Sequence, residues 1–332
     1  MQNNPVLYGG QAVIEGVMIR GRSRAALAVR RPDGSIIRRS IPLESWANTP
    51  LRKIFLLRGV IVLLETLMVG MKSLTISANE AAIAENPEEE QPLSSVAIAL
   101  LLGVSLLLGI VIFFLVPVFI SRLVENAGAN NFGANMVEGL IRLVLFVGYV
   151  WVIGKMNDIK RVFGYHGAEH MVVHAYEARE PLTVQSVRRF PAAHPRCGTS
   201  FLMTVVIVSI ILFMFFPRDP FWFLLVSRIV LVPIIAGISY EFIRYAGTHQ
   251  DNVWIRIFNS PNLLLQDLTT RKPDDGMVEV AITAIDYAIA LDDGRAVPND
   301  DSSTLSTEPY LPVATSATGA ADPDPPDSSP GF

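Results

Sequence analysis

The stretch VAIALLLGVSLLLGIVIFFLVPVFI, residues 96–120, decides the fold class because it contains no charged residue. About 20 helical residues are enough to cross the hydrocarbon core of a bilayer. Three further apolar stretches reach or approach that length: Val137–Gly154, Phe201–Phe216 and Phe221–Tyr240. The sequence therefore predicts an α-helical polytopic membrane protein with about four transmembrane helices, the first of them at Val96–Ile120.

The composition of the whole chain agrees with this class. Only 17% of the 332 residues are charged, whereas soluble proteins average about 25%. A lipid bilayer is thus an expected partner. The arginines form no basic stripe and the net charge is −4, so we expect no nucleic-acid partner. The single cysteine, Cys197, allows no internal disulfide and fits a reducing compartment.

The distribution of Lys and Arg predicts the orientation, because short cytoplasmic loops carry an excess of both. With four spans and a cytoplasmic N-terminus, the inner segments 1–92, 155–200 and 241–332 hold eleven, seven and five such residues. The outer loops hold only Arg122 and Arg218. Both termini are therefore predicted to be cytoplasmic. A fifth crossing at Ile54–Gly70 would move the seven charges outside, so that stretch is predicted to be an interfacial or re-entrant amphipathic helix.

A small cytoplasmic β-element is predicted at the N-terminus. Within Ala25–Pro42, two β-prone runs flank Pro32-Asp33-Gly34, where Pro fixes φ and Gly supplies a positive φ. The glycines at 9, 10, 16 and 21 match no phosphate-binding fingerprint and indicate close backbone approaches in strands. Near the other end, apolar residues at helical spacing predict a helix at Met277–Leu291, capped by Asp274 or Asp275.

The expected organisation has consecutive segments. They are a cytoplasmic β-rich element (1–53), an interfacial helix with an acidic linker (54–92), a transmembrane hairpin (93–154), a cytoplasmic His-rich segment (155–200), a second transmembrane hairpin (201–241), a cytoplasmic C-terminal helical segment (242–292) and a tail (293–332). The tail is rich in Ser, Thr, Pro and Asp, so it is predicted to be disordered.

The histidines are the residues most suited to chemistry. In YHGAEHMVVHAYE, His166, His170 and His174 share one helical face with Glu177. The first five residues after the tyrosine also form the pattern H-x-x-E-H. Two imidazoles one turn apart can bind one zinc ion, while the carboxylate of Glu169 can take a proton from water.

A third protein ligand has to come from another part of the chain. Glu241 is the first candidate, because it ends the fourth predicted span on the side of the histidine helix. The substitutes are His174 and, in HPRCGTS, His194 and Cys197, since zinc accepts nitrogen, sulfur or oxygen donors. Other interpretations stay open: solvated histidines on a polar helix, and a cysteine that is simply a small buried hydrophobe.

Two arginines, Arg142 and Arg228, fall inside predicted spans, where a charge has to face protein or water. Glu138 and Glu125 are the expected partners. A transport pathway and a structural ion pair both fit this pattern.

The blocks GGQAVIEGVMIRG, FGYHGAEHMVVHAYE, HPRCGTSF, GISYEFIRYAG and LTTRKPDD, within residues 8–290, together resemble the YqhQ family of bacterial multi-pass membrane proteins. That family is a domain of unknown function, described as predicted metal-dependent enzymes on the same histidine cluster. The resemblance implies a bacterial plasma-membrane location and leaves the reaction open.

Three functions follow as hypotheses. The leading one is a metal-dependent hydrolase in which zinc or another divalent metal is bound by His166, His170 and a third ligand, with Glu169 as general base. The alternative is a non-catalytic scaffold whose β-element and C-terminal helix bind a cytoplasmic protein partner. A transporter, resting on Arg142 and Arg228, is third.

Overall fold

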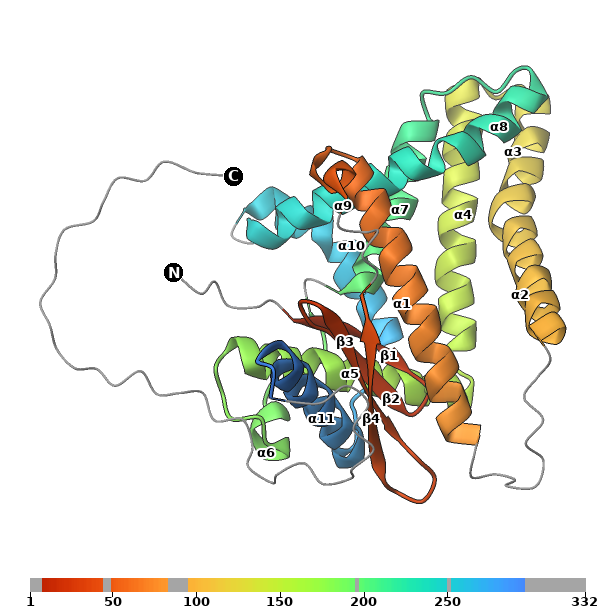
Figure 1. Ribbon diagram of the computed structural model, residues 1–332. Helices are drawn as coiled ribbons and strands as arrows, with labels where there is room; N and C mark the ends of the chain where they lie inside the picture. Colours follow the sequence, from red (N-terminus) through yellow and green to blue (C-terminus); the bar gives the residue numbers. More distant parts are fainter. Residues whose placement is uncertain (1–7, 44–48, 83–94, 195–196, 250–251, 296–332) are drawn as a thin grey trace, which may run out of the picture.

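The computed structural model describes residues 8–43, 49–82, 95–194, 197–249 and 252–295 (Figure 1). The described residues are mostly helical and form one four-stranded sheet near the N-terminus. The predicted acidic linker at 86–91 lies outside the described residues, as does nearly all of the predicted tail.

The sheet is an antiparallel meander in the order β1-β2-β3-β4. Its strands are β1 (Gly9–Val13), β2 (Gly16–Arg20), β3 (Arg24–Arg30) and β4 (Ile36–Pro42). The predicted hairpin is confirmed: Gly34 has a φ of +87°, and the Ser35 N–H donates to the Asp33 carboxylate. A Cβ on Gly16 would lie 2.4 Å from the carbonyl oxygen of Ala28, so the predicted close strand approach is confirmed there, whereas a Cβ on Gly9 would meet nothing within 4 Å.

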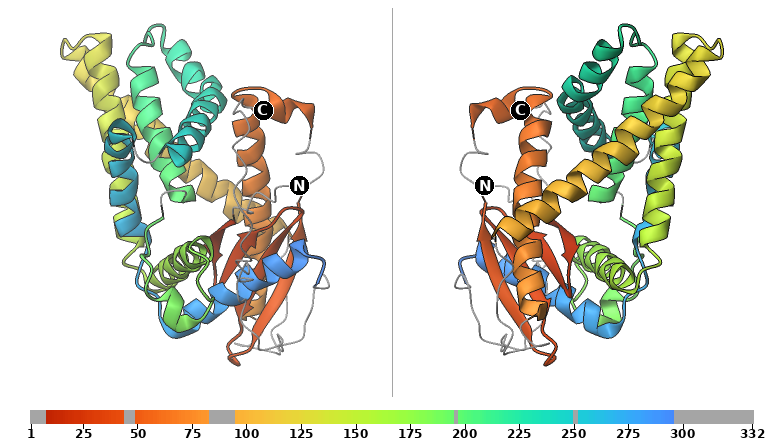
Figure 2. Two further views of the ribbon diagram at one scale, coloured as in Figure 1. Left: turned by 90° about the vertical axis from the view of Figure 1, so that its left-hand side faces the viewer. Right: turned by 90° about the vertical axis from the view of Figure 1, so that its right-hand side faces the viewer.

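Helices cover both faces of the sheet, which makes a unit of three layers (Figure 2). On one face lie α5 (Asn157–Glu177) and α11 (Asp275–Asp292), and on the other lies α1 (Leu57–Ala82). Residues Ala25–Val29 are all buried as a result, so β3 reads as a continuous apolar run. We call this unit, formed by the sheet with α1, α5 and α11, the three-layer unit. It joins segments that the sequence presents separately.

Helix α1 differs from the interfacial helix predicted at Ile54–Gly70. It is 26 residues long, and by length and composition it could cross a membrane. Its first turns pack against the helix that carries Tyr240, whereas its second half packs against the sheet. Glu65, which seemed to interrupt an apolar stretch, is buried and accepts a hydrogen bond from Arg20 of β2 at 2.6 Å. The acidic residue thus marks a contact with the sheet.

The remaining helices extend away from the three-layer unit (Figure 1). They are α2 (Ser95–Ile110), a π-turn (Val111–Leu115), α3 (Val116–Asn126), α4 (Asn131–Ile153), α7 (Gly198–Phe213), α8 (Phe221–Val230), α9 (Val232–Thr248) and α10 (Val253–Thr269), with the short η2 (Pro50–Lys53) before α1 and α6 (Val184–Val187) after α5.

Three or four helices of the described chain could span a membrane. Those long and apolar enough are Leu57–Ala81, Gly103–Asn126 and Asn131–Ile153. The third predicted span corresponds to α7, which has only 16 residues. The fourth predicted span is bent by 41° between α8 and α9, where Pro233 near the start of α9 cannot continue the preceding hydrogen-bond ladder.

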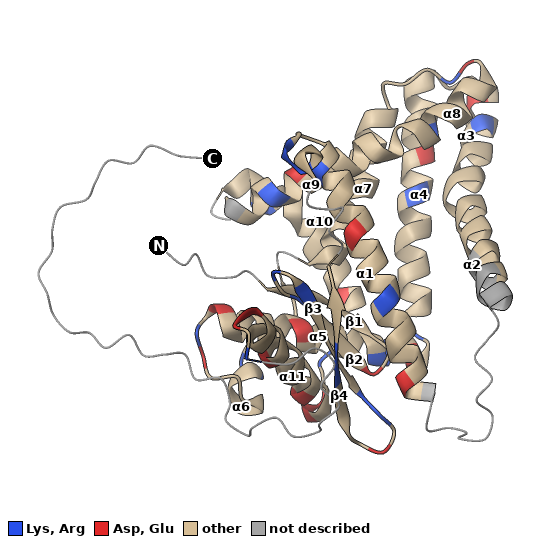
Figure 3. Cartoon of the chain, viewed as in Figure 1, with Lys and Arg blue, Asp and Glu red and all other residues tan. Residues whose placement is uncertain are grey.

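Charged residues gather on the sheet, α5 and α11, whereas α2, α4 and α7 carry few (Figure 3). The two described ends of the chain meet in the same unit, where the Tyr8 hydroxyl donates to Asp292 at 3.1 Å. This arrangement agrees with two ends on one side of a membrane. The cytoplasmic side itself stays a prediction from the Lys and Arg count.

The arginines of the helical half form a closed cluster, which we call the arginine cluster: Arg142, Arg218 and Arg228 around Glu138. Each guanidinium lies 2.8–3.0 Å from the Glu138 carboxylate. Glu138 is therefore confirmed as a partner of both predicted arginines, whereas Glu125 pairs with Arg218 at 3.0 Å. All four members are buried, which favours a structural ion-pair network over a pathway.

Candidate metal centre

The histidines predicted to share a helical face lie on α5, and that helix is confirmed. One face of α5 packs on the sheet and α11 through small side chains such as Ala168 and Ala175. A Cβ on Gly167 would lie 2.2 Å from the carbonyl oxygen of Arg271, so glycine allows the segment after α10 to approach. The histidine face is therefore covered by later parts of the chain.

The segment that leads into α7 lies along this face. The rings of His170 and His174 bond to successive carbonyl oxygens, those of Ala192 at 2.5 Å and Ala193 at 2.9 Å. Gln266 of α10 fixes the next residue, His194: its side chain accepts from the His194 N–H at 2.8 Å and donates to the His194 carbonyl at 2.9 Å. Sequence reasoning missed Gln266, which stands in no motif.

The tautomers of two histidines follow from their partners. Nδ1 of His166 lies 2.8 Å from the carbonyl oxygen of Thr269, and Nδ1 of His170 lies 2.5 Å from that of Ala192. A carbonyl can only accept, so each Nδ1 carries the proton, and in the neutral ring each Nε2 keeps a lone pair. Metal-binding histidines are oriented in this way by backbone carbonyls.

Those two lone pairs meet the thiol of Cys197. Nε2 of His166 lies 3.1 Å from its Sγ, and Nε2 of His170 has no hydrogen-bond partner among the described residues. One donor atom from each of the three residues lies within 4.8 Å of the others. Zinc bonds of 2.0–2.3 Å at tetrahedral angles place donors roughly 3.5 Å apart. The donor set therefore fits a small divalent ion, with a fourth position left for water.

Cys197 is held at the start of α7. The Thr199 N–H points to its Sγ at 3.3 Å, and the Thr199 hydroxyl lies 3.0 Å from it. Both contacts fix the position of the sulfur atom beside the histidine rings. Cys197 was predicted only as a substitute ligand. In the structure its Sγ lies beside the Nε2 atoms of His166 and His170, where a third ligand would bind the same ion.

Glu241, the first candidate for the third ligand, is not brought to the histidines. Its carboxylate forms a two-pronged ion pair with Arg58 at the start of α1, and neither donor group among the described residues includes it. The bend between α8 and α9 places the end of α9 against α1 and away from α5. The prediction of this ligand rested only on the fourth span ending on the same side as the histidine helix.

The substitutes His174 and His194 lie in a second donor group with Glu177. The ring centroids of the two histidines are 4.4 Å apart, and Nε2 of His194 lies 3.6 Å from the Glu177 carboxylate. This group adjoins the first, since the rings of His170 and His194 are 5.8 Å apart. Glu177 was expected on the histidine face but was not expected to act as a ligand.

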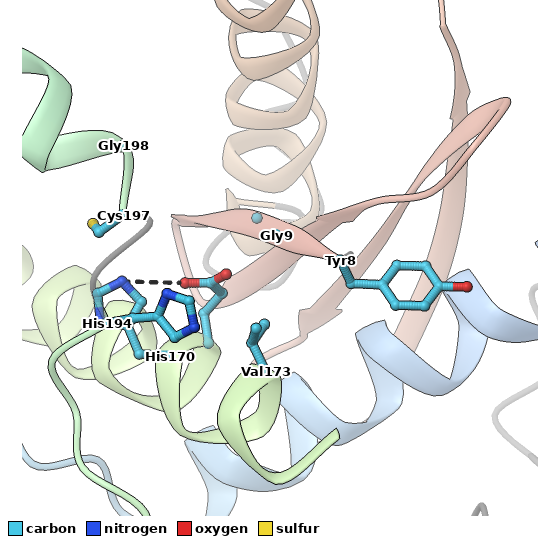
Figure 4. Close-up of a pocket in the computed structure, with 9 residues that line it drawn as sticks. Tyr8, Gly9, His170, Val173, His194, Cys197 and Gly198 are labelled. Carbon is cyan, nitrogen blue, oxygen red and sulfur yellow. Dashed lines mark ion pairs between the residues drawn. The ribbon is translucent and has the colours of Figure 1, made fainter. Parts of the chain in front are cut away.

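Glu169 lies fully within the site. Its carboxylate is 3.6 Å from Nε2 of His170, as marked in Figure 4, and it accepts from the N–H of Gly10. Burial raises the pKa of Glu169, while His166, His194 and the Gly10 N–H oppose that shift. Burial also lowers the pKa of His170 and of His194, so both rings stay neutral and able to bind a metal.

A small pocket of about 40 Å³ lies between these groups and β1. His170, His194 and Cys197 gather on one side of it, and Gly9 of β1 lies on the other, with the Tyr8 ring directed away (Figure 4). This volume has room for water, because one water needs only about 10–15 Å³ of such space. The glycine-rich opening of the chain therefore forms a wall of the site.

Comparison with known proteins finds the same family that the sequence motifs resemble. A family model described as a protein of unknown function (DUF1385) matches residues 54–291. The uncharacterized protein YqhQ of Bacillus subtilis (strain 168) is 35% identical over 298 residues, which cover 87% of this chain and 94% of YqhQ. No solved structure matches the chain significantly.

Proposed function

This chain belongs to the DUF1385 (YqhQ) family of proteins of unknown function, and from its own side chains we propose that it is a metal-dependent hydrolase at the cytoplasmic face of the bacterial plasma membrane. One observation carries this proposal. The Nε2 atoms of His166 and His170 face the Sγ of Cys197, while backbone carbonyls hold the opposite ring nitrogens.

His166, His170 and Cys197 would hold the ion, zinc or another divalent metal. Zinc accepts histidine nitrogen and cysteine sulfur, and catalytic zinc sites hold the ion with three protein ligands and leave the fourth position open. A metal bound there supplies a Lewis acid and lowers the pKa of a bound water. Backbone carbonyls of Thr269 and Ala192 fix both rings, as partners of metal-bound histidines commonly do.

Glu169 would act as the general base. Its carboxylate lies in the pocket that has room for water, and the Gly10 N–H holds it in place. Burial raises the pKa of Glu169, which makes its carboxylate a stronger proton acceptor. The substrate would be hydrolysed at the point where the Glu169 carboxylate faces the ring of His170.

Metal analysis of the purified full-length protein tests the proposal. We expect about one equivalent of metal in the wild type and in the control variant His249→Ala, since His249 is exposed and far along the chain from both donor groups. The double variant His166→Ala/His170→Ala and the single variant Cys197→Ala should lose it. A full equivalent in the double variant, or none in the wild type after growth with added zinc, would refute the assignment.

The scaffold hypothesis loses its main support from the fold. It required that the β-element and the C-terminal helix offer surfaces to a partner protein. In the structure, Val17 and Ala28 of the sheet and Val278 and Ile285 of α11 pack into one core. These faces are used within the chain, and the arginines that motivated a transporter are enclosed in the arginine cluster. The hydrolase is the function that the side chains favour.

A further inference from the structure

A large apolar cavity lies beside the proposed metal ligands. Its volume is about 690 Å³, within the 300–1,000 Å³ typical of sites that enclose a ligand. Six elements line it: β1, α1, α5, α7, α9 and, through Thr269, the end of α10. We propose that the substrate of this enzyme is an acyl lipid of the bilayer, whose hydrocarbon chain occupies this cavity. The inference rests on the proposed hydrolase function and adds the substrate class.

Most of the lining is apolar, and this apolar part comes mainly from α1 and α7, through Leu63, Leu67, Met71, Phe201 and Leu202 among others. Four lining residues, which we call the inner end, lie together: His166, Cys197, Thr199 and Thr269. Gln11, Thr66 and Tyr240 also line the cavity. A peptide in the apolar part would leave buried amide groups without partners, which costs several kcal/mol. An acyl chain has no such groups, so it suits this part of the cavity better.

The inner end meets the small pocket that has room for water. Gly10, Cys197 and Gly198 line both spaces. The proposed metal ligands therefore lie between the small pocket, which is lined by Glu169 and has room for water, and the apolar cavity. A lipid ester bound with its chain in the cavity would place its carbonyl carbon at this junction.

Hydrolysis of such an ester needs only a water molecule and the Glu169 carboxylate as proton carrier. Water from the small pocket adds to the carbonyl carbon while Glu169 takes one of its protons. The bond between the carbonyl carbon and the alcohol oxygen then breaks, and Glu169 returns the proton to that oxygen. The products are a fatty acid and the alcohol part of the lipid.

The cavity is accessible from the side on which a bilayer would lie. Leu67 and Met71 of α1 are 58% and 40% exposed, and Leu202 of α7 is 49% exposed, so the wall is part of the outer surface. These residues belong to apolar helices, one of which could span a membrane. Exposed apolar surface on such helices suits contact with lipid tails. A chain could therefore enter laterally.

Photolabelling of the full-length protein tests this inference. The protein is placed in vesicles of phosphatidylglycerol and phosphatidylethanolamine that contain a phospholipid with a diazirine in its acyl chain. We expect labelling on the inner wall, at Phe163 of α5 and Thr199 of α7, which are half-buried lining residues. In Leu63→Trp, whose larger side chain fills the cavity, this labelling should fall at least fivefold.

Leu64→Trp is the matched control, because Leu64 is the next residue on α1, is 47% exposed and does not line the cavity. Labelling in this variant should stay at the wild-type level. Leu202→Trp repeats the test from α7 in case Leu63→Trp does not fold. Inner-wall labelling that persists in folded Leu63→Trp and Leu202→Trp, or that is absent from the wild type, would overturn the inference.

Metal content, measured on the same samples, separates the two proposals. A metal-loaded protein without inner-wall labelling would contradict the acyl lipid as substrate but would support the metal site. A labelled protein that binds no metal would support binding of the lipid chain in the cavity but would contradict the proposed hydrolase function.

Discussion

The arginine cluster and the candidate metal centre both bury ionisable side chains, but they differ in how the hydrogen-bonding capacity of these groups is satisfied. In the arginine cluster, three guanidiniums share the Glu138 carboxylate, and Asn135 and Ser121 accept further hydrogen bonds. In the metal centre, Nε2 of His170 has no hydrogen-bond partner among the described residues, and Glu169 has a raised pKa.

This difference indicates what each region is for. A buried polar network in which the groups satisfy one another stabilises a structure and needs nothing further. A buried lone pair without a donor has a cost, unless a ligand uses it. We therefore interpret the arginine cluster as structural and the histidines as a binding site, although the sequence presented both as candidates.

The largest expected effect comes from Glu138→Ala. This change leaves three buried guanidiniums without their shared carboxylate, and breaking a buried ion pair from one side costs about 3–5 kcal/mol. Chemical unfolding in detergent should show this loss. Glu125→Ala is the control, because Glu125 is partly exposed and contacts only Arg218 of the three, so it should cost about 1 kcal/mol or less. Equal stability of Glu138→Ala and wild type would break the comparison.

An intermediate effect is expected from Gln266→Ala on the other side of the comparison. Gln266 holds the backbone of His194 and donates to Ser200 at 2.9 Å, so it positions the segment that carries Ala192 and Cys197. Loss of such an outer partner typically lowers metal affinity 10–100-fold. Competition with a zinc chelator measures it.

Asn262→Ala serves as the control for Gln266→Ala, since Asn262 is a buried amide on the same helix that contacts Thr204 on α7. It should lose stability but keep its zinc affinity. If both variants lose zinc equally, Gln266 acts through general packing and its assignment as a positioning residue fails.

The sequence predicted the local features of the site better than its assembly. The helix of His166 and His170 and the hairpin at Asp33 and Gly34 follow from short-range spacing, and both are confirmed. Glu241, the first candidate for the third ligand, does not join the histidines because its position depends on tertiary structure: the predicted fourth span is bent between α8 and α9, and Glu241 pairs with Arg58. Periodicity also could not show that Glu65 faces the sheet, since its partner Arg20 lies 45 residues earlier.

The smallest effect on metal binding is expected from Asp286→Asn, which tests whether an unsatisfied buried group is by itself a sign of function. Oδ1 of Asp286 on α11 has no hydrogen-bond partner among the described residues, and burial raises the pKa of Asp286 to about 7, well above the 3.8 of an exposed Asp, although Arg295 opposes the shift. Asp286 belongs to neither donor group. We therefore expect Asp286→Asn to keep its metal and to change stability only.

The sign of that change follows from proton linkage. Between pH 4 and 7 the folded protein holds a proton on Asp286 that the unfolded chain has released, so stability falls as pH rises through this window. Asn carries no such penalty, so Asp286→Asn should be more stable by at most about 4 kcal/mol at pH 8, with the gain vanishing below pH 4. Asp293→Asn, at an exposed position, should show no such profile. Metal loss in Asp286→Asn would mean that α11 contributes to metal binding. It would contradict our conclusion that Asp286 is unsatisfied without having a role in the site.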